Sequence, residues 1–265
     1  MNTKLILSFT TLLLTVITGC ELLLEPPTQS HLALGNPSNA GEEPNNYLME
    51  KPQYVLSYNR ERGTANWVAW QLSSKWLGEV QRQEDFRSDE SLPSDWYHVS
   101  SSDYTRSGYD RGHMTPSADR TANEEDNSAT FLMTNIVPQT PNNNRGAWKD
   151  LEEYCRDLVK EGKELYIIAG VSGEREKIGK NKQVIPPTYT WKVIVVLDQP
   201  GQGVRGVSTD TRVITVDVPN RTNTSLSWEK YRVSVDQLET KTGYDFLNRV
   251  PESIQKVIES RVDNL

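Results

Sequence analysis

Cysteine is scarce in this sequence of 265 residues, with only Cys20 and Cys155 present. Two cysteines so far apart cannot form the paired motifs of a zinc ribbon or of a zinc-type nuclease site. If Cys20 carries a lipid, as argued below, Cys155 has no disulfide partner and the fold contains no disulfide. The remaining chain is long enough to be stabilised by a hydrophobic core alone.

Positive charge is also in deficit, because 29 lysines and arginines face 36 aspartates and glutamates, giving a net charge of -7. Proteins that bind nucleic acid obtain much of their affinity by neutralising phosphates. An acidic protein can therefore serve that function only if its cations are gathered locally and a metal ion supplies part of the charge.

Long apolar runs are absent except for one near the start, from Leu5 to Ile17, which follows Lys4. Its 13 residues are fewer than the roughly 20 that span a bilayer, and the layout is typical of a secretory signal. The run ends in Ile17-Thr18-Gly19-Cys20, the residue order of a bacterial lipobox. We therefore expect residues 1–19 to be removed and Cys20 to be lipidated. The alternative is an ordinary signal peptide and a secreted protein.

This layout predicts an exported protein, anchored to a membrane by lipid and facing the periplasm or the exterior. Residues 20–30 would form the lipidated cysteine and a short tether, and residues 31–265 a single domain. The sequence contains no internal repeat and no low-complexity segment.

Apolar patterning predicts an α+β fold with a central, mostly antiparallel sheet flanked by helices. Helices are expected at 147–160, 236–242 and 251–262, and a loop-rich region between residues 75 and 127. The expected strands are 55–58, 67–72, 129–134, 164–169, 190–197 and 211–218.

The segment YDRGHMTPSADR places Asp110, Arg111 and His113 within four positions of each other. Hydrolysis of a phosphodiester requires a base for the attacking water and positive charge for the transition state. His113 could be this base and Arg111 a phosphate ligand, while Gly112 allows a close approach of the backbone. A surface histidine beside an Asp–Arg ion pair is the alternative interpretation of these four letters.

About thirty residues later, Asn144 stands before a predicted helix that carries Glu152 and Arg156. Spacings of eight and four residues would let one helix present all three side chains to one broad side. Mg²⁺ prefers oxygen ligands and keeps several waters, so the Asn144 amide and the Glu152 carboxylate suit it. The alternative is a capped surface helix with a Glu152–Arg156 salt bridge.

Together the two segments resemble the DNA/RNA non-specific endonucleases, the ββα-metal nucleases, and most closely their cyanobacterial members. The motifs SGYDRGH, SADRT, EDN.ATFLMTN and PQTP.NNR stand in the family's order, and the resemblance covers most of residues 31–265. It implies a ββα-metal active-site element built from a strand ending near His113, a strand near Phe131, and the helix after Asn144.

The resemblance also implies roles for the residues that match the family's motifs. His113 matches the general base, Asn144 the direct ligand of the metal, and Glu152 a residue that holds metal-bound water. Arg82 matches the arginine that stabilises the transition state. The remaining positions match a carboxylate that supports the site, Asp110, and arginines on the phosphate side, Arg111, Arg145 and Arg156.

The implied function is endonucleolytic hydrolysis of single- and double-stranded DNA and RNA, leaving 5′-phosphate ends. One Mg²⁺ ion is the implied cofactor, with Mn²⁺ as a substitute, and the implied partners are DNA, RNA and a membrane. No feature of the sequence identifies a protein inhibitor or an oligomeric state.

Two rival functions are kept open at this point. One is a catalytically weak envelope lipoprotein that binds nucleic acid on the same scaffold, which predicts a damaged site. The other is a phosphodiesterase or phosphatase for small substrates, which predicts a second, carboxylate-rich metal cluster.

Overall fold

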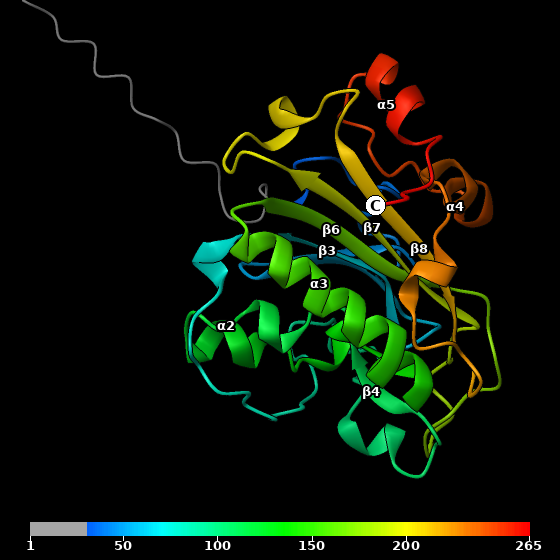
Figure 1. Cartoon of the computed structure of the whole chain (residues 1–265). Coiled ribbons are helices and arrows are strands. Elements are labelled where there is room, and N and C mark those ends of the chain that lie inside the picture. Colours follow the sequence, from blue (N-terminus) through cyan, green and yellow to red (C-terminus); the bar gives the residue numbers. More distant parts are fainter. Residues whose placement is uncertain (1–30) are drawn as a thin grey trace, which may run out of the picture.

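The computed structural model describes residues 31–265, and Figure 1 shows their arrangement as a central sheet with helices on both sides. The predicted signal peptide, the lipidation of Cys20 and the tether lie outside the described residues. Within residues 31–265, no helix combines the length and apolarity needed to cross a membrane.

The central sheet of the described chain has six strands in the order β1-β2-β3-β6-β7-β8, and every neighbouring pair is antiparallel. The strands are β1 (Tyr47–Lys51), β2 (Tyr54–Asn59), β3 (Thr64–Leu72), β6 (Glu164–Ser172), β7 (Tyr189–Leu197) and β8 (Arg212–Pro219). Five of the six were predicted. The edge strand β1 was not, because its mixed sequence YLMEK follows the turn-like EEPNN and is only partly buried.

Helices cover both faces of this sheet, so successive residues of a strand enter different cores. Ile167 and Ile194 lie in the core shared with α3 (Lys149–Lys160). On the other face, Ile168 and Val193 pack with residues of α4 (Val235–Thr242) and α5 (Glu252–Ile258). The predicted α+β class, with an antiparallel sheet between helices, is confirmed.

A second sheet pairs β4 (Asp110–His113) with β5 (Ile136–Gln139) in antiparallel register, with Gly112 opposite Val137. A kinked turn, Asn143–Trp148, and then α3 follow β5. The indole of Trp148 donates a hydrogen bond of 3.2 Å to the carbonyl of His113, which ties the helix to β4. These elements form the expected β–β–α unit.

The predicted strand over Ala129–Thr134 is wrong. Helix α2 (Glu124–Ala129) ends there, capped at its start by Asn123, whose side chain accepts a hydrogen bond from the Asp126 amide at 2.8 Å. A single turn of 3₁₀ helix, Met133–Asn135, then leads into β5. An apolar run of this length cannot be assigned to strand or turn by periodicity alone. The second strand of the β–β–α unit is therefore Ile136–Gln139.

Two further expectations concern the helices and Cys155. The last helix ends at Ile258 instead of near residue 262. Cys155 is a free, buried thiol on the inner face of α3, and burial raises its pKa to about 12. Its role is that of a small core residue.

Candidate active site

Strand β4 carries three polar side chains of the DRGH segment, and its glycine is required by packing. A Cβ atom on Gly112 would lie 1.9 Å from Oε1 of Gln139 on β5, far inside van der Waals contact. A side chain at residue 112 would therefore displace the Gln139 side chain, which occupies this space beside β4. The close backbone approach that the sequence suggested is present.

Asp110 links β4 to the turn after β5. Its Oδ2 accepts a hydrogen bond of 2.9 Å from Nδ2 of Asn144 and one of 2.8 Å from Nε of Arg145. A second bond from Arg145 reaches Oδ1 at 2.7 Å. Although partial burial opposes ionisation, these donors hold the pKa of Asp110 below its ordinary value.

The bond to Asp110 orients the Asn144 amide. A carboxylate only accepts hydrogen bonds, so the NH₂ group must face it and Oδ1 must face away. No hydrogen bond from residues 31–265 reaches that Oδ1. Asn144 thus offers one fixed, free amide oxygen, of the ligand type that Mg²⁺ prefers.

Asn144 does not belong to a helix continuous with α3, so that part of the sequence interpretation is wrong. Gly146 interrupts the turn with φ -110° and ψ -114°. A Cβ there would lie 2.5 Å from Leu226 Cδ2, so the glycine permits both the kink and the close approach. Asn144 consequently faces Asp110 on β4 and does not lie two regular turns below Glu152.

His113 lies between two aromatic rings and two cations. Its ring centroid is 4.8 Å from that of Phe131 and 5.4 Å from that of Phe86. Its Nε2 atom is buried and has no hydrogen-bond partner among the described residues. Burial, with the nearby charges of Arg82 and Arg111, lowers the pKa of His113 to about 3. The imidazole is therefore neutral at physiological pH, and one of its ring nitrogens carries a free lone pair.

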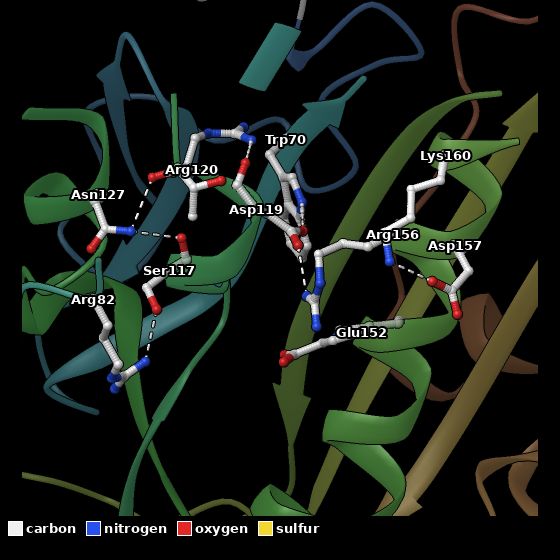
Figure 2. A network of polar contacts seen from close by, with 12 residues as sticks. Trp70, Arg82, Ser117, Asp119, Arg120, Asn127, Glu152, Arg156, Asp157 and Lys160 are labelled. Carbon is white, nitrogen blue, oxygen red and sulfur yellow. Dashed lines mark hydrogen bonds and ion pairs between the residues drawn. The ribbon is translucent and has the colours of Figure 1, made fainter. Parts of the chain in front are cut away.

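The same two rings support the arginines that flank His113. The guanidinium carbon of Arg111 lies 4.2 Å from the Phe86 ring centroid, and that of Arg82 lies 4.8 Å from that of Phe131. Arg82 is also held by its NH1 donating to Ser117 Oγ at 2.7 Å, as Figure 2 shows. Arg82 is also paired with Glu84, and Arg111 is exposed. The two guanidinium groups thus lie beside a neutral base.

Asn127 of α2 holds the two segments that position Arg82. Its Nδ2 donates to the Ser117 carbonyl at 2.8 Å (Figure 2). Its Oδ1 accepts from the Gln83 amide at 3.1 Å. The loop that carries Arg82 is therefore bonded to the loop that carries its hydroxyl partner.

Glu152 on α3 is paired with a lysine from the central sheet. Nζ of Lys192 lies 3.2 Å from Oε1 of Glu152 and 4.0 Å from the centroid of the Trp148 ring. Burial raises the pKa of Glu152 above its ordinary value, although Lys192 opposes this. Glu152 retains 14 % exposure of its side chain, so water can reach the carboxylate.

Arg156 is bound to Asp119 and not to Glu152, so the alternative of an i,i+4 salt bridge is wrong. Its NH1 donates to Oδ1 of Asp119 at 2.9 Å, and the other carboxylate oxygen accepts from Nε1 of Trp70 at 3.0 Å. Figure 2 shows the Asp119 carboxylate between the two donors. Arg156 is therefore fixed by a fully buried carboxylate.

The predicted residues fall into three groups in the structure. Asp110, Asn144 and Arg145 form the first, and His113 and Arg111 of β4 form the second with Arg82 from a loop. The third consists of Glu152 and Arg156 on α3 with their partners. Arg145 is 70 % exposed and engaged by Asp110, so it reaches a phosphate only through its remaining donors.

Sequence reasoning assigned no role to several residues that position the site: Lys192, Asp119, Ser117, Phe86 and Phe131. One signal was available for Lys192, which interrupts the apolar strand TWKVIVVL. A lysine that is 1 % exposed on such a strand requires a buried partner. The other four have ordinary surroundings in the sequence, and only the tertiary fold reveals them.

The oxygen donors present fit a single hard cation held with few protein ligands. Asn144 supplies one oriented oxygen, and Glu152 a partly accessible carboxylate on the helix that follows. Within the described residues, three acidic or other metal-binding side chains converge only at Asp236, Glu239 and Glu259. The donor set at the site is thus that of a cation which keeps several waters or substrate oxygens.

An open groove of about 930 Å³ begins beside the active-site strand, where Tyr109 precedes Asp110. Five exposed cations line it against one carboxylate, Glu176, and none of the five is ion-paired within residues 31–265. They are Arg106, Arg175, Lys177, Lys180 and Lys182. This basic groove is a local positive surface on a protein of negative net charge.

Comparisons with known proteins identify the family of this chain. The sequence model of the DNA/RNA non-specific endonucleases matches residues 33–253. A protein named Nuclease from Nostoc sp. is 54% identical over 264 residues, covering 95% of this chain and 96% of its own. Mitochondrial endonuclease G of Homo sapiens is 29% identical over 77% of this chain and 70% of its own. A crystal structure of the EndoG/EndoGI complex matches with a TM-score of 0.70 and 26% identity, over 85% of this chain and 93% of that one.

Proposed function

This chain belongs to the DNA/RNA non-specific endonuclease family, and we propose that it cleaves both nucleic acids with one Mg²⁺ ion and His113 as general base. We further propose that each cut leaves a 5′-phosphate and that Mn²⁺ can replace Mg²⁺. The family relation carries the endonuclease activity. The metal, the base and the product ends rest on the arguments below.

One observation carries the catalytic proposal. A neutral, buried histidine on β4 lies between two arginine side chains, and Asp110, the first residue of the same strand, orients Asn144. The histidine is His113, flanked by Arg82 and Arg111. A base, positive charge and an oxygen ligand for a cation are the three requirements of metal-assisted phosphodiester hydrolysis.

In the proposed reaction, His113 accepts one proton from a water molecule as its oxygen attacks phosphorus. The bond from phosphorus to the 3′ oxygen breaks, and the 3′ oxygen leaves with the electron pair and takes a proton from solvent. The 5′ fragment thus ends in a 3′-hydroxyl, and the other fragment keeps the phosphate. Atoms and charge balance with water as the only co-reactant.

Arg82 and Arg111 are proposed to stabilise the extra negative charge on the phosphoryl oxygens. Both are held in place before substrate binds, by Ser117 and by aromatic rings, so little reorganisation is required. Asn144 would hold the Mg²⁺ directly and Glu152 through water, and the ion would supply Lewis-acid stabilisation of the leaving oxygen.

The basic groove is proposed to bind the sugar–phosphate backbone beyond the scissile bond. Its lysines lie on one exposed segment, and such contacts carry no sequence information directly. This surface accounts for acceptance of any base sequence, and it favours a polymeric substrate over a small phosphodiester. A catalytically weak binding protein would lack the intact base, arginines and metal ligand.

The test is cleavage of plasmid DNA, ribosomal RNA and bis(p-nitrophenyl) phosphate by purified protein, in Mg²⁺, in Mn²⁺ and in excess EDTA. Both polymers should be cut in either metal and neither in EDTA, while the small ester should be a poor substrate. The cleavage products should carry a phosphate at their 5′ ends, and removal of this phosphate should prevent their ligation.

Activity that persists in EDTA would contradict the metal proposal, and cleavage of DNA alone would contradict the lack of sugar specificity. Efficient hydrolysis of the small ester would favour a small-substrate phosphodiesterase. Binding of both polymers without cleavage would favour the lipoprotein that only binds nucleic acid.

We also propose that the mature protein is a lipoprotein that begins at Cys20 and is exported. The basis is the order Ile17-Thr18-Gly19-Cys20 after an apolar run. Mass spectrometry of the mature N-terminal peptide should show an acylated Cys20. A free amino group at any other residue would instead indicate a plain secreted enzyme.

A further inference from the structure

Three carboxylates meet where α5 is attached to α4, on the side of the sheet opposite α3. They belong to Asp236 and Glu239 of α4 and to Glu259, the residue that directly follows α5. One oxygen from each lies within 4.8 Å of the other two. The amide of Asp236 also donates to the Glu259 carbonyl at 3.1 Å, which fixes the two segments side by side.

Glu259 is the unusual member of this acidic cluster. It is only 6 % exposed, and its Oε1 atom is buried without a hydrogen-bond partner among the described residues. A buried carboxylate that lacks both a donor and a cation is costly, so an unpaired one inside a cluster of like charges requires an explanation.

No protein cation compensates the cluster in the described part of the chain. The nearby charges that act on Glu259 are those of Glu239, Asp236 and Asp245, and burial together with these raises its pKa to about 8. Lys241 and Lys256, the lysines closest in sequence, are paired with Asp217 and Glu252 instead. Glu239 is partly satisfied by the Phe246 amide at 2.9 Å.

We propose that Asp236, Glu239 and Glu259 bind one calcium-sized divalent cation, which fastens α5 to α4. Ligands on opposite sides of Ca²⁺ are about 4.6–5.2 Å apart, given bonds of about 2.3–2.6 Å. The three oxygens lie within 4.8 Å of one another, close to this range, so small side-chain movements would bring all three to bonding distance of one such ion. Mg²⁺, with bonds of about 2.0–2.1 Å, would require the oxygens to move closer.

This site is separate from the active site in position and in chemistry. Val235 and Leu238 of α4 pack in the core on one face of the sheet, whereas Leu151 of α3 packs on the other. Figure 1 shows α4 and α5 on one side and α3 with β4 on the opposite side. The cation would therefore stabilise the fold and take no part in the cleavage of nucleic acid.

The test is thermal unfolding of chelator-treated protein, followed by circular dichroism, with added CaCl₂, added MgCl₂ or EDTA. Calcium at about 100 times its Kd should raise Tm by about 5–10 °C for a domain of this size. The same concentration of magnesium should give a smaller shift. Asn144→Ala should keep the full calcium response, because its substitution lies in the other site.

Glu259→Gln provides the sharpest comparison. The substitution replaces a buried ionisable group by a neutral amide, so in EDTA the variant should unfold at the wild-type Tm or higher, while its calcium response should be lost. Glu239→Gln should weaken the response. Glu252→Gln, also on α5 but outside the cluster, is the matched control and should respond as the wild type does.

A Tm that calcium leaves unchanged, or an equal shift in Glu259→Gln and wild type, would overturn the proposal and leave a protonated Glu259 as the explanation. If Glu259→Gln does not fold, equilibrium dialysis with ⁴⁵Ca²⁺ decides the question on Glu239→Gln and Asn144→Ala. Glu239→Gln should bind one calcium ion fewer than the wild type, whereas Asn144→Ala should bind as many as the wild type. Loss of a calcium ion from Asn144→Ala but not from Glu239→Gln would refute the site.

Discussion

Asn144 and Asp110 are 34 residues apart in the sequence, and Nδ2 of the first donates to Oδ2 of the second at 2.9 Å. The bond joins the turn before α3 to strand β4, and it leaves the Asn144 amide oxygen as the free group. The orientation of the proposed metal ligand, Asn144 Oδ1, is therefore fixed by the Asp110 carboxylate, which does not itself need to contact the metal.

This relationship predicts a difference between two substitutions. Asn144→Ala removes the proposed direct ligand, so the Mg²⁺ concentration that gives half-maximal plasmid cleavage should rise, with activity partly restored at high Mg²⁺. Asp110→Ala leaves the ligand but frees its orientation, and outer-shell changes of this kind typically cost about 10–100-fold in metal affinity. Titration of Mg²⁺ for each variant is the measurement.

His113→Ala tests the general base, whereas Asn144→Ala tests the metal ligand. A general base contributes about 10²–10⁴-fold, so its removal should lower kcat by that amount with an almost unchanged Mg²⁺ midpoint. If high Mg²⁺ rescues His113→Ala and Asn144→Ala alike, the assignment of base and ligand is wrong.

The environment of His113 also predicts the pH dependence. Its pKa is lowered to about 3, whereas an exposed histidine titrates near 6.5. The base should thus stay unprotonated as the pH falls from 8 to 5, and kcat/KM at saturating Mg²⁺ should show no acid limb near 6.5. A fall with an apparent pKa near 6.5 that disappears in His113→Ala would contradict this.

Arg82 and Ser117 should differ in the size of their effects. Arg82→Ala removes positive charge from the transition state and should lower kcat by about 10²–10³-fold, as loss of one preorganised donor does. Ser117→Ala removes one hydrogen bond to the guanidinium and should cost only about fivefold, because Phe131 still supports Arg82. Equal losses in the two variants would mean that Ser117 does more than position Arg82.

The sequence predicts an element of this structure correctly where its apolar pattern distinguishes a strand from a turn. The strands β3, β6 and β7 are long apolar segments, and each was expected within two or three residues of its observed bounds. The segment Ala129–Thr134 is equally apolar, but the Asn135 side chain bonds the carbonyls of Thr130 and Thr115 and closes a turn there. Such long-range polar contacts leave no periodic signal.

The site shows the same division. Motif order predicted His113, Asn144 and Glu152 as site residues, but spacing alone placed Asn144 and Glu152 on one helix. The turn is interrupted at Gly146, and the Leu226 side chain, 80 residues away in the chain, lies close to this position. Lys192 and Asp119 were missed because their partners lie on other elements. A lysine within an apolar strand does, however, indicate a buried partner.

The basic groove predicts how salt affects substrate binding. Replacing Lys177, Lys180 and Lys182 by Gln should raise KM for duplex DNA and reduce the salt slope of log KM by up to about 3, roughly one per phosphate contact. Changing Lys230, Lys256 and Arg261 to Gln removes the same charge at other exposed positions and is the matched control. Equal slopes in both triple variants would show that only net charge matters, and the groove assignment would fail.

Glu259 predicts how the metal-free protein responds to pH. Its pKa is about 8 in the folded state and 4.5 ordinarily, so between these values the folded state holds a proton that the unfolded state has lost. The free energy of unfolding should therefore fall as the pH rises through this window, by no more than about 1.4 kcal/mol per pH unit, since one proton is involved.

Urea unfolding in EDTA at several pH values measures the slope. Glu259→Gln should lose this component while Glu252→Gln keeps it, and calcium should flatten the wild-type slope by taking the place of the proton. A slope unchanged by Glu259→Gln would assign the proton to another carboxyl group and remove the physical basis of the cation site.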